Sequence, residues 1–183
     1  KPTQSPKPPP PPLTKMRYDE LILDNARRIA IDAHYGQMYG DVPYTKHLES
    51  VVSVCNYFGL GSEIAAACWL HDALEDCTPK WNNAIALDFE GRIYQAVWGV
   101  TDEPGKNRKE RKAKTYAKTA ANPDAVLVKL CDRIANVHSC KINNPSLFKM
   151  YANEQPEFMA KLRVMERGGK FEEMGNHLQK MFE

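Results

Sequence analysis

Four side chains of the types that bind metals stand at three places in the chain: His47, the adjacent pair His71-Asp72, and Asp132. The stretches around them are apolar with helical spacing, so separate helices should supply them. Two neutral imidazoles and two carboxylates form a nitrogen and oxygen donor set that suits a borderline or hard divalent metal, with positions left for water and substrate. This pattern predicts a metal-dependent hydrolase.

A further carboxylate, Glu75, follows the His71-Asp72 pair at helical spacing. We expect one helix from Ser62 to Asp76, in which Glu75 shares the face of that pair. A carboxylate one turn from a metal can orient or deprotonate the bound water, whose pKa the metal lowers. Glu75 is therefore a candidate for activating water.

Asp132 lies in a stretch that is apolar almost all round, which predicts a buried helix over residues 124–139. An unpaired charge there would be strongly unfavourable, so Asp132 needs a cation. The two candidates are its neighbour Arg133 and a metal. Asn136, one turn further on, would point the same way and could hydrogen-bond a substrate or ligand.

The elements that must position these residues are predicted to be helices throughout. Apolar residues recur at intervals of three and four from Met16 onward, and no convincing period-two strand appears, so we expect an all-α fold. The later helices are expected over residues 44–58, 62–76, 80–89, 92–101, 108–120, 124–139, 147–153 and 157–165, with a short terminal helix from Lys170.

Length and composition limit the number of domains and the classes of partner that the chain can have. With 183 residues, 43% hydrophobic and 26% charged, the chain should form one folded domain over residues 16–183. A net charge of +2 is too small to indicate a nucleic-acid binder. No apolar run of about 18 residues and no secretion signal is visible, so we expect neither a membrane span nor export.

Residues 1–15 differ from the rest because prolines dominate them. Proline fixes φ and removes amide donors, so we expect an extended linker or tail, with docking into a partner's aromatic groove as the alternative.

The five cysteines lack metal-site spacing and fall on apolar helical stretches. They are expected to be reduced core residues of a cytoplasmic protein.

The order His47, His71-Asp72, Glu75-Asp76, Asp132 resembles the HD phosphohydrolase superfamily. The surrounding segments narrow the resemblance to its Rel/SpoT-type alarmone hydrolases. The matching pieces are Ala-His-Tyr-Gly-Gln at 33–37, Pro-Tyr-Thr-Lys-His-Leu at 43–48, Leu-His-Asp-Ala-Leu-Glu-Asp at 70–76, Val-Thr-Asp at 100–102 and Val-Lys-Leu-Cys-Asp-Arg-Ile-Ala-Asn at 128–136.

The resemblance implies an HD-domain helical bundle that removes the 3′-pyrophosphate from guanosine tetra- and pentaphosphate with the help of manganese, leaving GDP or GTP. It makes Glu75 and Asp76 the catalytic pair that activates water. The implied metal ligands are His47, His71, Asp72 and Asp132. The implied substrate contacts are Asn136, Lys106, Arg108, Lys109 and Tyr151.

One departure from the family pattern bears on the substrate. Family members carry a basic pair after the Gly-Gln step, where this chain has Met38-Tyr39. The change removes up to two charge-assisted contacts, each worth about 1.5 to 3 kcal/mol. Tyr39 could stack on a base in their place, which makes it a further substrate-binding candidate.

Two alternative functions follow. The first is an HD-type hydrolase of another nucleotide, such as a deoxynucleoside triphosphate, an adenosine alarmone or NADPH, which the departure at Met38-Tyr39 favours. The second is a non-catalytic, metal-containing binding or regulatory module, against which the intact Glu75 and Asp76 argue. The donor set also accepts iron, zinc or nickel in place of manganese. The sequence leaves homo-oligomer formation open, and the chain is too short to carry a synthetase domain as well.

Overall fold

Helices dominate the computed structural model, which describes residues 14–77, 79–89 and 91–183. They are α1 (Lys15–Ala33), α2 (Thr45–Tyr57), α3 (Ser62–Leu70), α4 (Ala73–Asp76), α5 (Pro79–Asp88), α6 (Arg92–Val100), α7 (Arg108–Ala120), α8 (Pro123–Asn143), α9 (Pro145–Lys161) and α10 (Gly169–Lys180), with a 3-10 turn at Met165–Arg167. The all-α prediction is confirmed.

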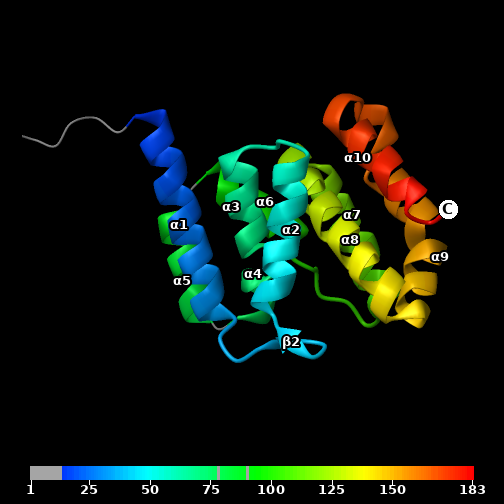
Figure 1. Ribbon diagram of the computed structural model, residues 1–183, viewed down its shortest axis with the longest axis horizontal. Helices are drawn as coiled ribbons and strands as arrows, with labels where there is room; N and C mark the ends of the chain where they lie inside the picture. The colour runs from blue at the N-terminus through cyan, green and yellow to red at the C-terminus, as the bar shows by residue number, and fades with distance from the viewer. Residues whose placement is uncertain (1–13, 78, 90) are drawn as a thin grey trace, which may run out of the picture.

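The centre of the molecule is formed by α2, α3 and α8, which pack against one another. In Figure 1, α1 and α5 lie at one end of this centre and α9 and α10 at the other. Leu48, Leu70 and Leu130, one from each central helix, are fully buried. Burying each such side chain stabilises the fold by about 1.5 to 3 kcal/mol.

Local sequence signals explain why α8 begins and ends where it does. The Asn122 side chain accepts hydrogen bonds from the amides of Asp124 and Ala125, and Pro123 occupies the first turn. Asn144 ends α8 and, through its side chain, caps α9. The helix is therefore four residues longer at its end than the predicted 124–139, because its apolar face continues to Cys140.

The predicted single helix from Ser62 to Asp76 is wrong. The chain forms α3, then a turn at His71-Asp72, then the short α4, which restarts as the Asp72 carbonyl accepts from the amides of Glu75 and Asp76. The turn places the two metal-ligand candidates between helices. Pro79, expected only to stop a helix, begins α5, where its missing amide costs nothing.

Two other differences from the predicted elements involve proline and glycine. The helices expected at 147–153 and 157–165 are one helix, α9, because Pro156 lies on its exposed side, where water can meet the carbonyl that proline leaves unbonded. A small hairpin, β1 (Met38–Tyr39) with β2 (Val42–Pro43), turns at Gly40, whose φ is +59°. Two-residue strands are too short to give a period-two pattern.

The proline-rich segment lies almost wholly outside the described residues, which begin at Thr14. The Thr14 side chain caps α1, so Lys15 belongs to the helix and not to the expected tail. Among the described helices, none combines the length and the apolar character that crossing a membrane requires.

Gly99 sets how closely α6 approaches α8, because a Cβ at this position would lie 2.6 Å from the Ala125 Cβ. Gly99→Ala should therefore lower the free energy of unfolding by about 1 to 2 kcal/mol, since overpacking outweighs the gain of about 1 kcal/mol in helix propensity. Urea unfolding followed by circular dichroism measures the change. The matched control is Gln95→Ala on the exposed side of α6, which should shift stability by less than about 0.5 kcal/mol. Equal stability of the two variants would contradict close packing at Gly99.

Candidate active site

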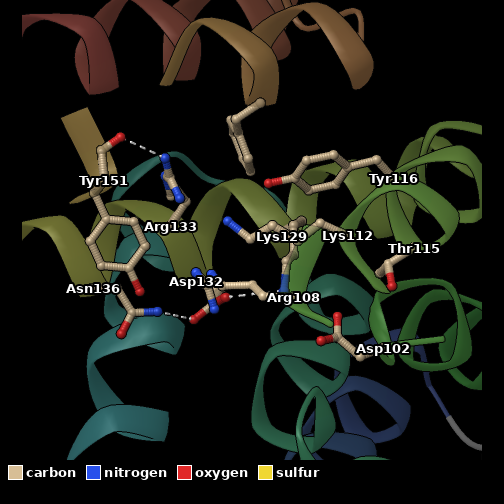
Figure 2. Close-up of a pocket in the computed structure, with 11 residues that line it drawn as sticks. Asp102, Arg108, Lys112, Thr115, Tyr116, Lys129, Asp132, Arg133, Asn136 and Tyr151 are labelled. Atoms are coloured by element: carbon tan, nitrogen blue, oxygen red, sulfur yellow. Dashed lines mark hydrogen bonds and ion pairs between the residues drawn. The ribbon is translucent and has the colours of Figure 1, made fainter. Parts of the chain in front are cut away.

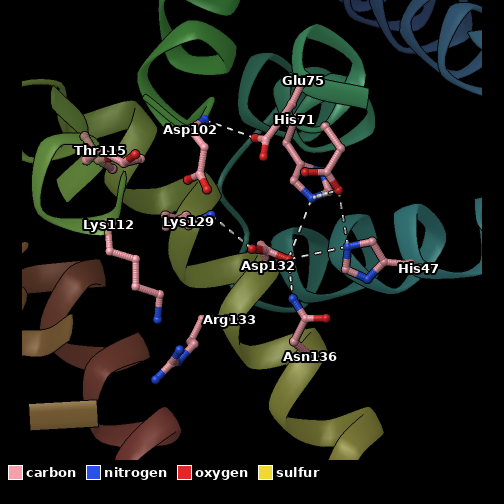
Figure 3. Close-up of polar contacts among 12 residues, drawn as sticks. His47, His71, Glu75, Asp102, Lys112, Thr115, Lys129, Asp132, Arg133 and Asn136 are labelled. Atoms are coloured by element: carbon pink, nitrogen blue, oxygen red, sulfur yellow. Dashed lines mark hydrogen bonds and ion pairs between the residues drawn. The ribbon is translucent and has the colours of Figure 1, made fainter. Parts of the chain in front are cut away.

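The four predicted metal ligands come together at the centre of the bundle, as Figure 3 shows for three of them. His47 Nε2 lies 3.4 Å from Asp132 Oδ1 and 3.7 Å from Asp72 Oδ2. His71 Nε2 lies 2.8 Å from Asp72 Oδ2 and 3.7 Å from Asp132 Oδ1. Both imidazoles are buried. We call this group the cage.

The orientation of His71 shows that the cage fits a cation. His71 Nδ1 lies 2.8 Å from the Cys68 carbonyl oxygen, a pairing that requires a proton on Nδ1. Its Nε2 is buried and faces the Asp72 and Asp132 carboxylates, and within the described parts of the chain no well-directed hydrogen bond satisfies it. A lone pair facing two carboxylates is unfavourable unless a positive charge lies between them.

The pKa values support this interpretation. Burial lowers the pKa of His71. The nearby Asp72 and Asp132 carboxylates raise it by a larger amount, so the pKa is well above its usual value. Burial raises the pKa of Asp72, and His71 brings it down to about 2. Burial raises the pKa of Asp132 as well, but Lys129 and the two imidazoles hold it well below its usual value. Both carboxylates therefore stay ionised and favour either a proton or a metal at His71 Nε2. The nitrogen and oxygen donors fit a divalent metal.

Tyr44 fixes the Asp72 side chain. Its hydroxyl donates to Asp72 Oδ2 at 2.5 Å, and its ring stacks on His34 with centroids 4.7 Å apart. His34 Nδ1 pairs with Gln37 Oε1 at 2.7 Å. Burial and the Asp72 charge raise the pKa of Tyr44, so the phenol remains a donor. His34 thus braces the cage from a second layer.

The protein cation beside Asp132 is Lys129, which the sequence analysis did not consider. Lys129 Nζ lies 3.5 Å from Asp132 Oδ2. Burial lowers the pKa of Lys129, but Asp132 raises it more, so the ammonium stays charged. Arg133, one of the two expected partners, turns away and donates to the Tyr151 carbonyl at 2.9 Å. Arg133 is therefore not the cation that compensates Asp132.

Asn136 points toward Asp132 as predicted, and its Nδ2 donates to Asp132 Oδ1 at 2.5 Å. The Tyr39 hydroxyl donates to Asn136 Oδ1 at 2.6 Å, while the Tyr39 ring stacks on His47 with centroids 4.8 Å apart. The hairpin therefore touches both a metal-ligand candidate and a substrate candidate. One face of the Tyr39 ring is covered by His47, which leaves only the other for a base.

The two candidate catalytic carboxylates have different partners. Glu75 Oε2 accepts from the Asp102 amide at 3.0 Å, and the two residues lie beside His71 in Figure 3. Burial raises the pKa of Glu75 above its usual value. Asp76 Oδ2 accepts from Gln37 Nε2 at 2.9 Å. Burial thus makes Glu75 more basic than an ordinary glutamate, and Asp76 is tied to the loop that precedes the hairpin.

A cavity of about 150 Å³ opens beside Asp132, and positively charged side chains line much of it (Figure 2). The lining residues are Asp102, Arg108, Lys112, Thr115, Tyr116, Lys129, Asp132, Arg133, Asn136, Tyr151 and Phe158. We call this the basic pocket. Arg108, Asn136 and Tyr151 line it as candidates for substrate binding. Lys109 lines an adjoining hollow, and Lys106 lines neither.

Glu154 holds three of the four cations of the basic pocket together. Its carboxylate pairs with Arg108 at 3.3 Å, with Arg133 at 3.5 Å and, more closely, with Lys112. Arg133 also lies over the Tyr151 ring, 4.4 Å from its centroid. Burial raises the pKa of Glu154, but Lys112 and Arg108 lower it below the usual value, so the carboxylate is ionised.

Sequence reasoning missed Lys112, Lys129, Arg133 and Glu154 as pocket residues. Lys112 had a signal, because it stands four residues after Arg108 and so on the same face of α7. Lys129 stands three residues before Asp132, within the motif itself. No sequence signal points to Glu154, because only the packing of α9 against α7 and α8 brings it to the pocket.

The fold agrees with comparisons to known proteins. The HD domain family matches residues 26–165, and the chain belongs to this family. A solved structure described as a metazoan ortholog of SpoT that hydrolyses ppGpp superposes with a TM-score of 0.72 at 20% identity, covering 88% of this chain and 97% of that one. That likeness identifies the helical fold.

Two longer bacterial proteins are similar in sequence. The guanosine-3′,5′-bis(diphosphate) 3′-pyrophosphohydrolase of Aquifex aeolicus is 32% identical over 124 residues, which are 66% of this chain and 18% of the relative. The protein of the same name from Vibrio cholerae is 29% identical over 142 residues, which are 73% of this chain and 20% of the relative. The chain thus spans about a fifth of these relatives.

Tyr44→Phe tests whether the phenol orients Asp72 for a metal. The variant keeps the ring stacked on His34 and removes only the hydroxyl donor, so Mn²⁺ affinity should fall by about tenfold, as for other residues that orient metal ligands. Isothermal titration calorimetry on chelator-treated protein measures it. Tyr35→Phe is the control, because Tyr35 is 91% exposed. Unchanged Mn²⁺ affinity in Tyr44→Phe would show that the hydroxyl does not prepare the site.

Proposed function

We propose that this chain is a hydrolase that removes the 3′-pyrophosphate from guanosine 3′,5′-bis(diphosphate)-type alarmones, giving GDP or GTP and pyrophosphate. The observation that carries the proposal is the adjacency of the cage and the basic pocket, which share Asp132, while Asn136 of the pocket donates to that carboxylate. A cation site beside four basic side chains suits a nucleotide with phosphates at two positions. The names of the two similar bacterial proteins support the same substrate.

The proposed ligands are His47, His71, Asp72 and Asp132, and the proposed cation is Mn²⁺. The donor set suits this ion, and buried His71 Nε2, which faces two carboxylates without a well-directed hydrogen bond, supports a cation there. A divalent cation held there would polarise a phosphoryl oxygen and lower the pKa of a coordinated water.

The basic pocket would bind and orient the substrate. Arg108, Lys112 and Arg133 would pair with phosphate oxygens through charge-assisted hydrogen bonds, in exchange for some of their contacts with Glu154. Lys129, beside Asp132, would face the phosphoryl group under attack and balance its developing charge. Asn136 and Tyr151 would contact the sugar or phosphate region.

Glu75 would act as the general base. Burial raises the pKa of Glu75 toward neutral pH, and a general base is most effective when its pKa lies near the working pH. Glu75 would take a proton from the attacking water as the new oxygen–phosphorus bond forms. The bond between phosphorus and the 3′-oxygen would break, that oxygen would take a proton from solvent, and the nucleotide, GDP or GTP, would leave. Asp76, held by Gln37, would orient the water.

An HD-type hydrolase of another nucleotide is the second candidate, and Tyr39 favours it. The residue stands where the alarmone hydrolases carry a basic pair, and its ring packs on His47 at the edge of the cage. This arrangement replaces charge with an aromatic surface. The catalytic residues and their roles would be the same, while the substrate would be a deoxynucleoside triphosphate, an adenosine alarmone or NADPH.

We further propose a cytoplasmic location, supported by five cysteines that all remain unpaired thiols. A partner for the proline-rich segment would bind residues outside those described. Neither proposal affects the chemistry of the site.

The proposal is tested by product analysis. Metal-free protein, with and without Mn²⁺, is incubated with guanosine tetraphosphate, its adenosine analogue, deoxynucleoside triphosphates and NADPH, and the products are separated by ion exchange. Mn²⁺-dependent release of pyrophosphate and GDP from the guanosine compound is expected. Turnover of another nucleotide alone would replace the substrate, and no turnover of any would favour a non-catalytic module.

Glu75→Gln separates catalysis from metal binding. It should lower kcat by about 100-fold to 10,000-fold, because it removes the base, while Mn²⁺ affinity measured by calorimetry stays the same. For the unmodified protein, kcat/KM should fall as the pH drops through the raised pKa of Glu75, at a higher pH than for an ordinary glutamate. Glu49→Gln, on the exposed pair with Lys46, is the control. A near-normal rate in Glu75→Gln would show that another residue is the general base.

Glu154→Gln tests the electrostatics of the basic pocket. Removing one negative charge leaves Arg108, Lys112 and Arg133 without this carboxylate partner, so KM for the anionic nucleotide should fall by about tenfold at low salt, a gain of about 1.4 kcal/mol, and by less at high salt. Glu157→Gln makes the same charge change three residues away on the exposed side of α9. Equal effects of the two variants would show that only net charge matters.

A further inference from the structure

Three cysteines meet in the core beneath the cage. Cys55 on α2, Cys68 on α3 and Cys131 on α8 are each fully buried, and their sulfur atoms all lie within 4.8 Å of one another. They come from positions far apart in the chain, so only the packing of the three central helices brings them together. We call them the thiol cluster. None of them belongs to the site described above.

We propose that the thiol cluster binds one thiophilic divalent cation, of the zinc or cadmium type, through three sulfur atoms. The spacing suits this geometry. With metal–sulfur bonds of about 2.3 Å, three sulfurs around a cation in their plane lie about 4.0 Å apart. Separations of no more than 4.8 Å need at most a small inward movement. Sulfur ligands select soft cations, whereas the imidazole and carboxylate groups of the cage suit harder ones.

Charge favours a divalent over a monovalent cation. As each sulfur binds, its thiol releases a proton to solvent, so three thiols and one dication give a complex of charge −1 and three protons. A monovalent cation would leave a charge of −2 in a fully buried place, which is more unfavourable.

Binding would link the same three helices that hold the cage. Cys68 lies three residues before His71, and its carbonyl oxygen already fixes the His71 ring. Cys131 immediately precedes Asp132, and Cys55 lies on the helix of His47. A cation in the thiol cluster would therefore join α2, α3 and α8 one layer below the cage. Because it binds the folded chain, it should raise the unfolding temperature.

The test uses cadmium and the full chain, kept reduced by a phosphine so that no added thiol competes. One equivalent of cadmium should produce the ultraviolet charge-transfer band of thiolate-bound cadmium, a cadmium NMR shift typical of three sulfurs, and a higher unfolding temperature. Cys68→Ala and, independently, Cys55→Ala should lose most of the band and the stabilisation. His47→Ala, which alters the cage, should keep both.

Cys140→Ala is the matched control. Cys140 is also a buried thiol on α8, but its Sγ donates to the Val137 carbonyl and it stands outside the thiol cluster. This variant should retain the band. The proposal is overturned if the unmodified chain shows no band, if Cys68→Ala keeps the full band, or if cadmium lowers the unfolding temperature, which would mean that the thiols bind it only in unfolded chains.

Discussion

The structure depends on holding two carboxylates against two buried imidazoles. Asp72 and Asp132 face His47 and His71 in the interior, where charges of one sign repel strongly. The arrangement is favourable only with positive charge among these groups, and the protein supplies part of it through Lys129. The Tyr44 hydroxyl and the Asn136 amide add donors. The surrounding helices can be understood as the frame that this polar centre requires.

That frame explains two departures from regular helix. The chain breaks at His71-Asp72, so that the two side chains leave from a turn between α3 and α4 and reach the same centre. The hairpin closes over His47 and Asn136 by way of Tyr39. Both irregularities lie at the site, and the long regular helices α1 and α8 lie around it. Substrate contacts would come from α7, α8 and α9, so α8, which also carries Asp132, would serve both halves of the proposed reaction.

The sequence was sufficient for the class of fold and for the four cage residues, since their types, order and neighbours are all local signals. It was insufficient where long-range packing decides. Leu70 to Asp76 contains neither glycine nor proline, so nothing in its composition indicates the break. Arg133 and Lys129 are both cations near Asp132 in sequence, and only the direction of each side chain separates their roles. Lys112 lies in a charge run of the kind that usually faces solvent, yet Glu154 from α9 draws it into the pocket.

The tyrosines against the cage have a practical consequence. Tyr39 stacks on His47, and Tyr44 packs edge-on against the same imidazole with centroids 5.5 Å apart. Aromatic rings held in a fixed, asymmetric environment absorb left and right circularly polarised light to different extents. The near-ultraviolet circular dichroism contributed by these two phenols should therefore depend on the order of the cage, and the difference between the spectra of the unmodified chain and a Tyr39→Phe or Tyr44→Phe variant isolates the contribution of each from that of the other six tyrosines and three tryptophans.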